Sequence, residues 1–444
     1  MKKIFTTITL VAIVFFSSKA QNSTSTETPT RKCTTPILNA SYEEAFQQMM
    51  QKHEQFANNK KAVTVYNIPV IFHIIHSGQA VGTTFNISQA QVNSQITILN
   101  QDFRKTNTDF ATTVTQSAFV NAAADCEINF CAAKVSPTGT ILAEPGIERI
   151  LASSKGWSNP GYTDAYIDAT IKPNSSWDPT KYLNIWIISF SDNMTLGYAQ
   201  FPTVSAGTSP ITDIVGFGGA ANTDGVVFDY RYVGNVGSAT SPFNKGRTAT
   251  HEIGHWLGLR HINGDSNCGN DYCSDTPAQS SLTSGCPSTT GGVSAAGCGT
   301  VSPNPPGKMY QNYMDYSDDR CMTMFTLNQK ARMQAVMANC VRRSSLATST
   351  VCSTVGIEEN VSNIIMDVYP NPTNGELFVD VNLLDAQDFT VSVINTLGQT
   401  VKEVKQNQSN GGKIKIDLSD KNTGVYFVTI KTKSGSKVKR VVLQ

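Results

Sequence analysis

The stretch HEIGHWLGLRH at residues 251–261 constrains the fold more than any other part of this 444-residue chain, because it holds three of the six histidines. Residues four apart on an α-helix lie on one face, so His251 and His255 can present two imidazoles to one ion. Gly258 can adopt a positive φ, which would end the helix and turn the chain back beneath that ion. His261 is then placed to become a third ligand. The stretch therefore predicts a helix, a sharp turn and a metal site.

Three neutral imidazoles with one open position are typical of catalytic rather than structural zinc. Such an ion lowers the pKa of its water toward about 7 and polarises a carbonyl group. Glu252 lies one step around the helix, where we expect it to accept the proton of the water and pass it to a departing amine. The motif predicts amide hydrolysis without an acyl-enzyme. In the alternative, the histidines are merely buried and hydrogen-bonded, and the motif arises by chance.

The N-terminus has the features of an export signal. Lys2 and Lys3 precede the apolar run IFTTITLVAIVFF, and Ser18 and Ala20 provide small residues before a cleavage site. We therefore predict a signal peptide over residues 1–20; the alternative is a retained membrane anchor. No later stretch approaches the roughly 20 apolar residues that a membrane span needs. The mature chain is expected to be exported and to lack a transmembrane segment.

The charge balance identifies no partner. Lys and Arg number 35 and Asp and Glu 34, so the net charge is +1 and no overall field attracts nucleic acid or an anionic membrane. The basic run from Lys431 to Arg440 falls on the solvent face of alternating strands. We therefore expect no nucleic-acid partner.

Residues 21–60 are predicted to form a pro-segment. A Ser/Thr-rich start is followed by SYEEAFQQMMQKHEQFANNK, a helical pattern in which Ser41 and Glu44 would form a capping box. The expected apolar face of this helix comprises Phe46, Met49, Met50 and His53.

A larger unit is predicted over residues 61–350. Its strands are expected at VTVYNIPVIFHIIH (63–76), at 182–190 and at 224–234, and its helices at 89–103, at the histidine motif and at 327–339. Strands alternate with helices before the motif, and mostly loop follows it. This order indicates an α+β unit with a mixed sheet, an active-site helix and a loop-rich lower half.

After a linker at 351–361, the sequence pattern acquires a period of two. KIKIDLS (413–419) and VYFVTIKT (425–432) alternate apolar and polar residues between closely spaced turns. Residues 362–444 are therefore predicted to form a small all-β sandwich of the immunoglobulin-like kind.

The chain resembles the metzincin metallopeptidases, and specifically the pappalysin family, over most of residues 60–345. The resemblance rests on HEIGHWLGLRH followed by NYMDYSDDRCMTMFT at 312–326. It implies a secreted zinc endopeptidase that acts on proteins or peptides. It also implies that Met314 lies in an apolar turn beneath the imidazoles, and that Tyr316 is the hydroxyl partner of the tetrahedral intermediate.

The same resemblance bears on specificity. In relatives, the second aspartate of YSDD lies at the base of the S1′ pocket, which receives the side chain just after the scissile bond. Asp319 has that position here and would favour Arg or Lys there. Arg320 is its sequence neighbour and could neutralise it.

The stretch CGNDYCSDTP at 268–277 resembles the calcium-binding loop of the family, with Asp271 and Thr276 as the side-chain oxygen donors. The alternative is a turn in which Asp275 and Thr276 only bond the backbone.

Ten cysteines in an exported chain are expected to form disulfides. Their spacing alone does not fix the pairing. The resemblance implies the pairs Cys268–Cys298 and Cys286–Cys321, although Cys273 stands where relatives commonly have an apolar residue, so an exchange of partners is open. The cysteines whose pairing stays open are Cys126, Cys131, Cys273, Cys340 and Cys352.

Cys33, in the sequence RKCT, offers a mechanism of latency. Its thiolate could fill the fourth position on zinc and displace the catalytic water. A carboxylate switch is excluded in the pro-segment because no aspartate lies between residues 21 and 60. Cleavage near Lys60 and Lys61 would release the thiolate. Alternatively, Cys33 is half of a disulfide or an unpaired thiol of the tail.

The C-terminal unit resembles the sorting domain of the type IX secretion system, through VYPNPTNGELFVD, INTLGQTV, NTGVYFVTIKTKSG and KVKRVVLQ. The resemblance covers residues 362–444 and implies that the secretion machinery carries the chain across the outer membrane. Without it, a β-sandwich could equally bind carbohydrate or protein. The rival hypothesis for the whole chain is a non-catalytic surface adhesin that contains zinc.

Overall fold

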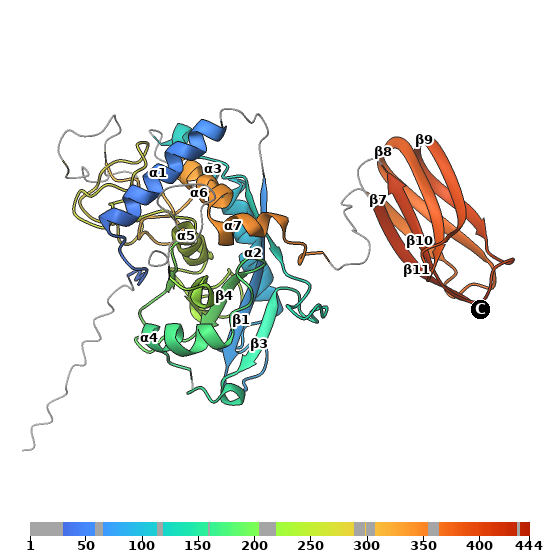
Figure 1. Cartoon of the computed structure of the whole chain (residues 1–444), viewed down its shortest axis with the longest axis horizontal. Coiled ribbons are helices and arrows are strands. Elements are labelled where there is room, and N and C mark those ends of the chain that lie inside the picture. The colour runs from blue at the N-terminus through green and yellow to red at the C-terminus, as the bar shows by residue number, and fades with distance from the viewer. Residues whose placement is uncertain are drawn as a thin grey trace, which may run out of the picture.

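The computed structural model describes residues 30–57, 65–112, 119–158, 160–203, 219–287, 298, 307–353, 364–432 and 436–444. The predicted signal peptide, the Lys60–Lys61 cleavage site and most of the predicted linker lie outside the described residues. The described residues between 30 and 353 form the larger unit, and those between 364 and 444 form the smaller unit (Figure 1).

A mixed six-stranded sheet forms the centre of the larger unit, in the order β2-β1-β4-β6-β5, with β3 also paired to β1. The strands are β1 (Tyr66–His76), β2 (Ile128–Ala132), β3 (Ile147–Leu151), β4 (Leu183–Ile188), β5 (Gly197–Ala199) and β6 (Val226–Asp229). Residues 68–75 of β1 are all buried, as expected for a central strand covered on both faces. All pairs are parallel except β5 with β6, so the short edge strand runs against the rest.

The helices of the larger unit are α1 (Ala40–Ala57), α2 (Gln89–Phe103), α3 (Asp109–Thr112), α4 (Asp164–Tyr166), α5 (Arg247–Trp256), α6 (Leu327–Asn339) and α7 (Val341–Ser344). The predicted bounds of α2 and α6 agree with the structure. The strand predicted at 224–234 is shorter, because the Asp229 carboxylate accepts a hydrogen bond from Arg231 N and starts a turn there.

Helix α1 lies against α6 (Figure 1). Its buried face includes Phe46 and Met49, in the same apolar core as α5 and α6. The predicted capping box is wrong. The Asn39 side chain caps the helix instead, by accepting a hydrogen bond from Tyr42 N at 2.9 Å, while Ser41 lies inside the helix.

The half of the unit after α5 is rich in loops, as predicted. Among its described residues, at 257–287, 298 and 307–326, none belongs to a named helix or strand. Disulfides join Cys268 to Cys298 and Cys286 to Cys321, the two pairs that the resemblance implies. A further disulfide joins Cys131 to Cys352, a pair that the sequence left open. Cys273 is buried as a free thiol.

The smaller unit is an all-antiparallel β-sandwich, which confirms the predicted class. Its strands are β7 (Ile364–Tyr369), β8 (Glu376–Asn395), β9 (Thr400–Asp417), β10 (Gly424–Thr432) and β11 (Ser436–Leu443). The first part of β8 pairs with β7 and its last part with β10, and register shifts occur in the β8–β9 pairing between these parts. The period-two residues of β8 and β10 form a separate apolar core.

Among the helices of the described residues, none has the length and apolar content needed to cross a bilayer.

Candidate metal centre and cleft

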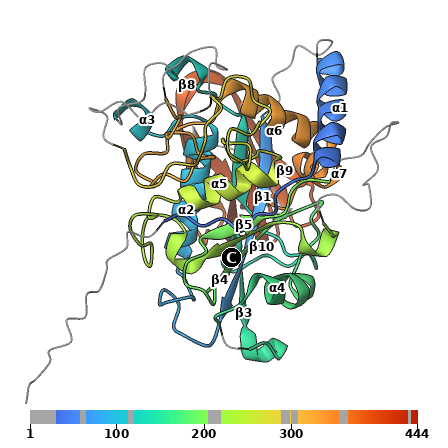
Figure 2. The same cartoon turned by 90° about the vertical axis from the view of Figure 1, so that its left-hand side faces the viewer.

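Helix α5 lies beside β5 (Figure 2) and also contacts β6, and all of its residues are buried. It starts after Gly246, whose φ is +71°. At this start, the Arg247 guanidinium pairs with Asp102 at 2.9 Å and with Asp109 at 2.6 Å. These buried ion pairs fix the beginning of the helix relative to α2 and α3.

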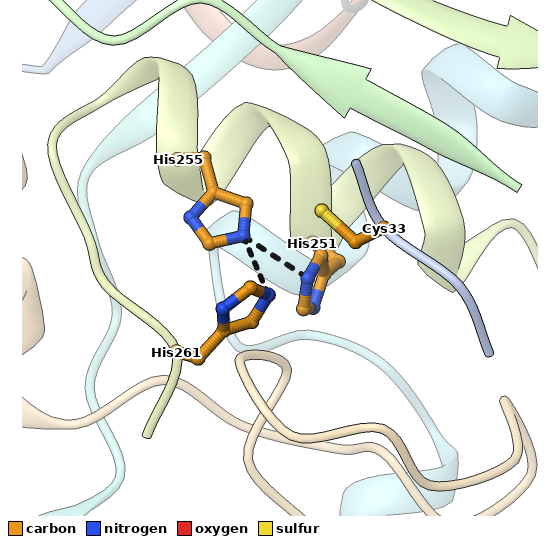
Figure 3. Close-up of side chains that lie close together, drawn as sticks. All are labelled: Cys33, His251, His255 and His261. Atoms are coloured by element: carbon orange, nitrogen blue, oxygen red, sulfur yellow. Dashed lines mark hydrogen bonds between the residues drawn. The ribbon is translucent and has the colours of Figure 1, made fainter. Parts of the chain in front are cut away.

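The three histidines of the motif converge (Figure 3). Nε2 of His255 lies 3.1 Å from Nε2 of His251 and 3.2 Å from Nε2 of His261. The turn that brings His261 back is made at Gly258, whose φ is +90°. A Cβ at Gly258 would also lie 2.7 Å from the ring of Phe46, so only glycine fits there.

Each imidazole is oriented through its other nitrogen. The Nδ1 atoms of His251, His255 and His261 lie 2.7, 2.7 and 2.6 Å from an oxygen acceptor. The acceptors are Tyr313 O, Leu259 O and Asp265 Oδ1, respectively. With Nδ1 protonated, every Nε2 lone pair faces the common point. Burial and the neighbouring imidazoles lower the pKa of His251 well below its usual value and that of His255 to about 3, so both rings are neutral.

Cys33 completes this cluster. Its Sγ and the three histidine nitrogens all lie within 4.8 Å of one another. A segment that runs beside β5 brings it there: Thr34 N donates to Gly197 O at 3.2 Å, and Leu196 N donates to Lys32 O at 2.9 Å. Three imidazoles and one thiol are a donor set that suits zinc. Burial raises the pKa of the Cys33 thiol, with the Glu252 charge adding to the effect, but a divalent cation reverses this because a coordinated thiol loses its proton.

Glu252 lies against Gly197 of β5 and next to Cys33. Its Oε2 lies 3.3 Å from Cys33 Sγ and accepts a hydrogen bond from Thr35 Oγ1 at 2.9 Å. Burial raises the pKa of this carboxyl to about 7. The side chain fits because Gly197 has no Cβ: one there would lie 3.2 Å from Glu252 Cγ.

Met314 and Tyr316 both lie next to the cluster. Met314 is fully buried, and its Sδ packs against Gly254 of α5, where a Cβ would come within 2.5 Å of the sulfur. The ring centre of Tyr316 lies 5.9 Å from that of His251 and 5.1 Å from that of His261. The structure thus places a soft apolar side chain under the helix and a phenol beside two of the imidazoles.

Asp319 is fully buried and forms an ion pair with a residue of the N-terminal segment. Arg31 donates to its Oδ1 at 2.6 Å, and the guanidinium also lies 4.9 Å from the centre of the Phe243 ring. The other carboxylate oxygen of Asp319, Oδ2, accepts hydrogen bonds from the backbone N–H groups of Lys245 at 2.8 Å and Arg247 at 3.2 Å. The buried Asp319 carboxylate is therefore paired with an arginine of the N-terminal segment.

The expectation that Arg320 could neutralise Asp319 is wrong. The Arg320 side chain is 66% exposed and pairs at 3.8 Å with Asp318. Consecutive side chains of this loop point in different directions, so the sequence neighbour is not the spatial one.

Asp271 and Thr276 are close together in the structure. The Thr276 hydroxyl lies 2.8 Å from both carboxylate oxygens of Asp271, and Cys273 N donates to one of them at 3.1 Å. Burial raises the pKa of Asp271 to about 7. Asp275 instead accepts hydrogen bonds from Thr326 Oγ1 and Asn328 N at the start of α6.

Sequence reasoning missed three residues of the site. Arg31 and Thr35 flank Cys33 at a spacing of two, which in extended backbone points all three side chains to one side. This spacing of two is the sequence feature from which Arg31 and Thr35 could have been predicted to accompany Cys33. Asp265, which orients His261, follows it by four residues, but the positive φ of Asp265 is not predictable from that spacing.

Two family models match this chain. One, described as pregnancy-associated plasma protein-A, matches residues 164–338. The other, described as a secretion system C-terminal sorting domain, matches residues 367–444.

The related proteins are secreted proteases. An extracellular metalloprotease of Verticillium alfalfae is 33% identical over 281 residues, which cover 63% of this chain and 78% of that protein. One from Colletotrichum graminicola is 31% identical, over 70% of this chain and 91% of its own.

Two solved structures resemble the larger unit. Mature mirolysin of Tannerella forsythia in complex with a cleaved peptide is 38% identical, with a TM-score of 0.54 over 64% of this chain and 97% of that chain. A promirolysin mutant of the same organism is 36% identical, with a TM-score of 0.56 over 72% of this chain and 97% of its own.

Proposed function

Since this chain belongs to the pappalysin family of secreted zinc metalloendopeptidases, we propose that it is made as a latent precursor and, once activated, cuts proteins before Arg or Lys. The observation that carries the proposal is the convergence of three Nε2 atoms beside one buried carboxylate. The chain also carries a type IX secretion sorting domain, which accounts for its export to the cell surface or beyond.

His251, His255 and His261 would hold the zinc ion through Nε2. When bound, zinc supplies a Lewis acid that acidifies the attacking water and polarises the scissile carbonyl. Glu252 is the proposed general base and acid: its carboxylate takes a proton from the water and gives it to the leaving amine. A pKa raised to about 7 by burial suits both transfers near neutral pH.

Tyr316 and Met314 have supporting roles in this proposal. The Tyr316 hydroxyl would donate a hydrogen bond to the oxyanion that forms during attack, which the position of its ring beside two imidazoles supports. Met314 would hold α5 at the correct depth, because its sulfur fills the space left by the missing Cβ of Gly254.

Latency is proposed to come from the segment that contains Cys33. Its thiolate would take the fourth position on zinc, while Thr35 binds the carboxylate of Glu252. One extended segment would thus block the metal and the base together. The match to promirolysin, which covers more of this chain than the match to mature mirolysin, supports a precursor of this kind.

The preference for Arg or Lys rests on Asp319. In the described structure, Arg31 fills this buried site with an ion pair at 2.6 Å. A carboxylate held by two backbone N–H groups binds a guanidinium well, and an uncharged side chain there would leave it without a cation.

A decisive experiment exposes a proteome-derived peptide pool to the activated protein with and without a chelator and reads the cleavage sites. We expect chelator-sensitive cleavage with Arg or Lys enriched just after the cut. Glu252→Ala should keep bound zinc and lose almost all hydrolysis. Asp319→Asn should still cleave, with the basic preference reduced.

The adhesin hypothesis predicts the opposite result. A Glu252→Ala protein with full biological function and an uncut peptide pool would contradict the peptidase assignment for this chain. Cleavage that is unchanged by the chelator would contradict the role of the metal.

A further inference from the structure

The N-terminal segment, residues 30–57, contacts the rest of the larger unit through two separate parts. The extended part, residues 31–35, contacts Asp319, the imidazole cluster and Glu252. The helical part, α1, lies against α6 (Figure 1). The residues that join the two parts, 36–40, are mostly exposed. The segment therefore has the form of a ligand with two binding parts and a short exposed link.

Helix α1 contributes apolar contacts. The apolar residues that it buries are Tyr42, Ala45, Phe46 and Met49. Phe46 fills the space beside Gly258, where a Cβ would lie 2.7 Å from its ring. The ring centre of Tyr42 lies 6.1 Å from that of Phe201, which in turn lies 5.5 Å from the ring centre of His255. The apolar surface that α1 covers therefore continues to the metal centre.

The same face of α1 brings one carboxylate to two arginines. Glu43 pairs with Arg332 at 2.8 Å and with Arg260 at 3.1 Å. The side chains of Glu43, Arg332 and Arg260 are 2%, 2% and 6% exposed. The larger unit thus presents a buried basic site within an apolar surface. Such a surface fits an amphipathic helix that carries a carboxylate among apolar side chains.

These contacts do not depend on the peptide chain beyond α1. They consist of ion pairs, hydrogen bonds and apolar packing made by residues 31–49. A cut between α1 and β1, such as the one expected near Lys60 and Lys61, therefore leaves each contact in place. The cut changes only the effective concentration of the segment, because a tethered ligand becomes a separate one that dilution can remove.

The extended part lies in the site in the direction opposite to that of a substrate. The proposed function places the residue after the scissile bond at Asp319, so a substrate runs from the metal centre to Asp319 in the N-to-C direction. The segment runs from Arg31 at Asp319 to Cys33 at the imidazoles. Its peptide bonds are therefore reversed relative to the bond that is cut, and the segment occupies the site without presenting a bond in the orientation for hydrolysis.

We propose that the surface around Gly258, Arg260 and Arg332 is a binding site for a separate chain, the cleaved N-terminal segment, and that the bound segment inhibits the peptidase as an independent molecule. This inference rests on the proposed function and deepens its account of latency. Helix α1 supplies most of the buried contact, and the extended part blocks the metal centre and Glu252. Cleavage by itself then yields an inactive complex, and activity appears when the segment is diluted or degraded.

The test adds a synthetic peptide of residues 30–57 to activated enzyme that has been freed of its own segment. Hydrolysis of a reporter peptide measures inhibition, and fluorescence anisotropy of the labelled 30–57 peptide measures binding directly. We expect saturable binding, with inhibition that rises in parallel and is relieved by dilution. A peptide of residues 30–39, which lacks most of α1, should need at least about tenfold higher concentration for the same inhibition.

Substitutions in the peptide test the contacts of α1 and leave the enzyme unchanged. Glu43→Gln should raise the concentration for half-inhibition at least about tenfold, because it removes the charge partner of buried Arg332. Phe46→Ala should have a similar effect, because it empties the space beside Gly258. Glu44→Gln is the matched control, since it makes the same change on the exposed face of the helix. It should inhibit as well as the parent peptide.

The outcomes separate the proposal from the function on which it rests. Full reporter hydrolysis in the presence of the 30–57 peptide, without binding, would overturn the proposal. Equal potency of the Glu43→Gln and Glu44→Gln peptides would refute the role of α1, and cleavage of the peptide within residues 31–35 would refute its reversed placement. An enzyme that binds the peptide but hydrolyses no reporter would overturn the proposed function and the inhibition with it, while the binding site would stand.

Discussion

At the scale of single residues, three side chains of one short segment each contact a different part of the site around α5. Arg31 binds Asp319, Cys33 lies among the imidazoles and Thr35 binds Glu252. Their spacing of two places them on one face of an extended chain. One extended segment beside β5 therefore contacts Asp319, the imidazole cluster and Glu252 together.

Cys33→Ala should make the uncleaved precursor active. The change removes the proposed fourth zinc ligand, so the open position becomes accessible to water. We expect peptide hydrolysis by the precursor to rise at least about tenfold, the change that corresponds to roughly 1.4 kcal/mol of lost binding. Cys126→Ala, which changes a buried thiol elsewhere, is the control. Equal precursor activity in both variants would argue against the thiolate switch.

Asp271 should make stability depend on pH and calcium. Its pKa is raised by burial to about 7 in the folded chain, so its contribution is present at acid pH and lost as pH rises from about 4 to about 7. If the carboxylate binds calcium, as the resemblance of this loop to the calcium-binding loop of the family implies, the added ion should restore the loss at neutral pH. Thermal unfolding at pH 5 and 8, with and without calcium, checks this. Asp271→Asn should unfold with a smaller response to pH than the parent chain and with little response to calcium.

At the scale of elements, helix α1 attaches the N-terminal segment to the core of the larger unit, next to the turn at Gly258. Glu43 is buried and pairs with Arg332 at 2.8 Å and with Arg260 at 3.1 Å. Phe46 packs beneath the Arg332 guanidinium, 4.0 Å from the ring centre. The segment that contains Arg31, Cys33 and Thr35 is therefore continuous with a helix that is anchored in the core by charge and by apolar burial.

Glu43→Gln should speed activation. The variant removes the paired carboxylate of buried Arg332 and leaves Arg260 with Asp265 as its only paired carboxylate among the described residues. Removal of one partner of a buried pair costs about 3–5 kcal/mol. We expect α1 to detach more readily, measured as faster proteolytic removal of the segment and earlier onset of peptidase activity. Glu44→Gln on the exposed face of the same helix is the control. Identical activation times for the two variants would show that the ion pairs do not hold the segment.

At the scale of the whole molecule, a covalent link closes the larger unit. The Cys131–Cys352 disulfide spans 221 residues and ties β2 to the chain that follows α7. Crosslinks that close long loops stabilise mainly by restricting the unfolded chain. The end of the larger unit is thereby fixed to its central sheet, just before the chain continues to the sorting domain.

Replacing both Cys131 and Cys352 with Ser should lower the free energy of unfolding by about 2–5 kcal/mol. Denaturant unfolding of the full chain, followed by tryptophan fluorescence, measures the change. Reductant should lower the stability of the parent chain at least as much as the double substitution does. A variant as stable as the oxidised parent would contradict the role of this link.

Deleting residues 362–444 should stop export at the periplasm. The sorting domain is the part of the chain that the secretion machinery is expected to recognise, so the larger unit alone would accumulate behind the outer membrane. Cell fractionation measures this. Normal export combined with lost adhesion to substrate would instead assign a binding role to the β-sandwich.

The features that the sequence predicted are those set by local periodicity. The bounds of α2 and α6, the α+β class, the β-sandwich and the helix that carries His251 and His255 all agree with the structure. Each depends on side chains a few residues apart, because helices repeat every 3.6 residues and strands every two. The predicted capping of α1 does not agree with the structure. Asn39 and Ser41 are both good capping residues, and only the folded structure selects Asn39.

The sequence by itself determined the chemistry available to this protein: three imidazoles, a carboxylate and a turn at Gly258, within eleven residues of one helix and its exit. Only the tertiary structure decided what faces that chemistry. Arg31 and Asp319 are 288 residues apart, and no periodicity links residues at such a distance. Their meeting depends on the path of the whole chain, which the burial of apolar residues from all parts of the larger unit sets.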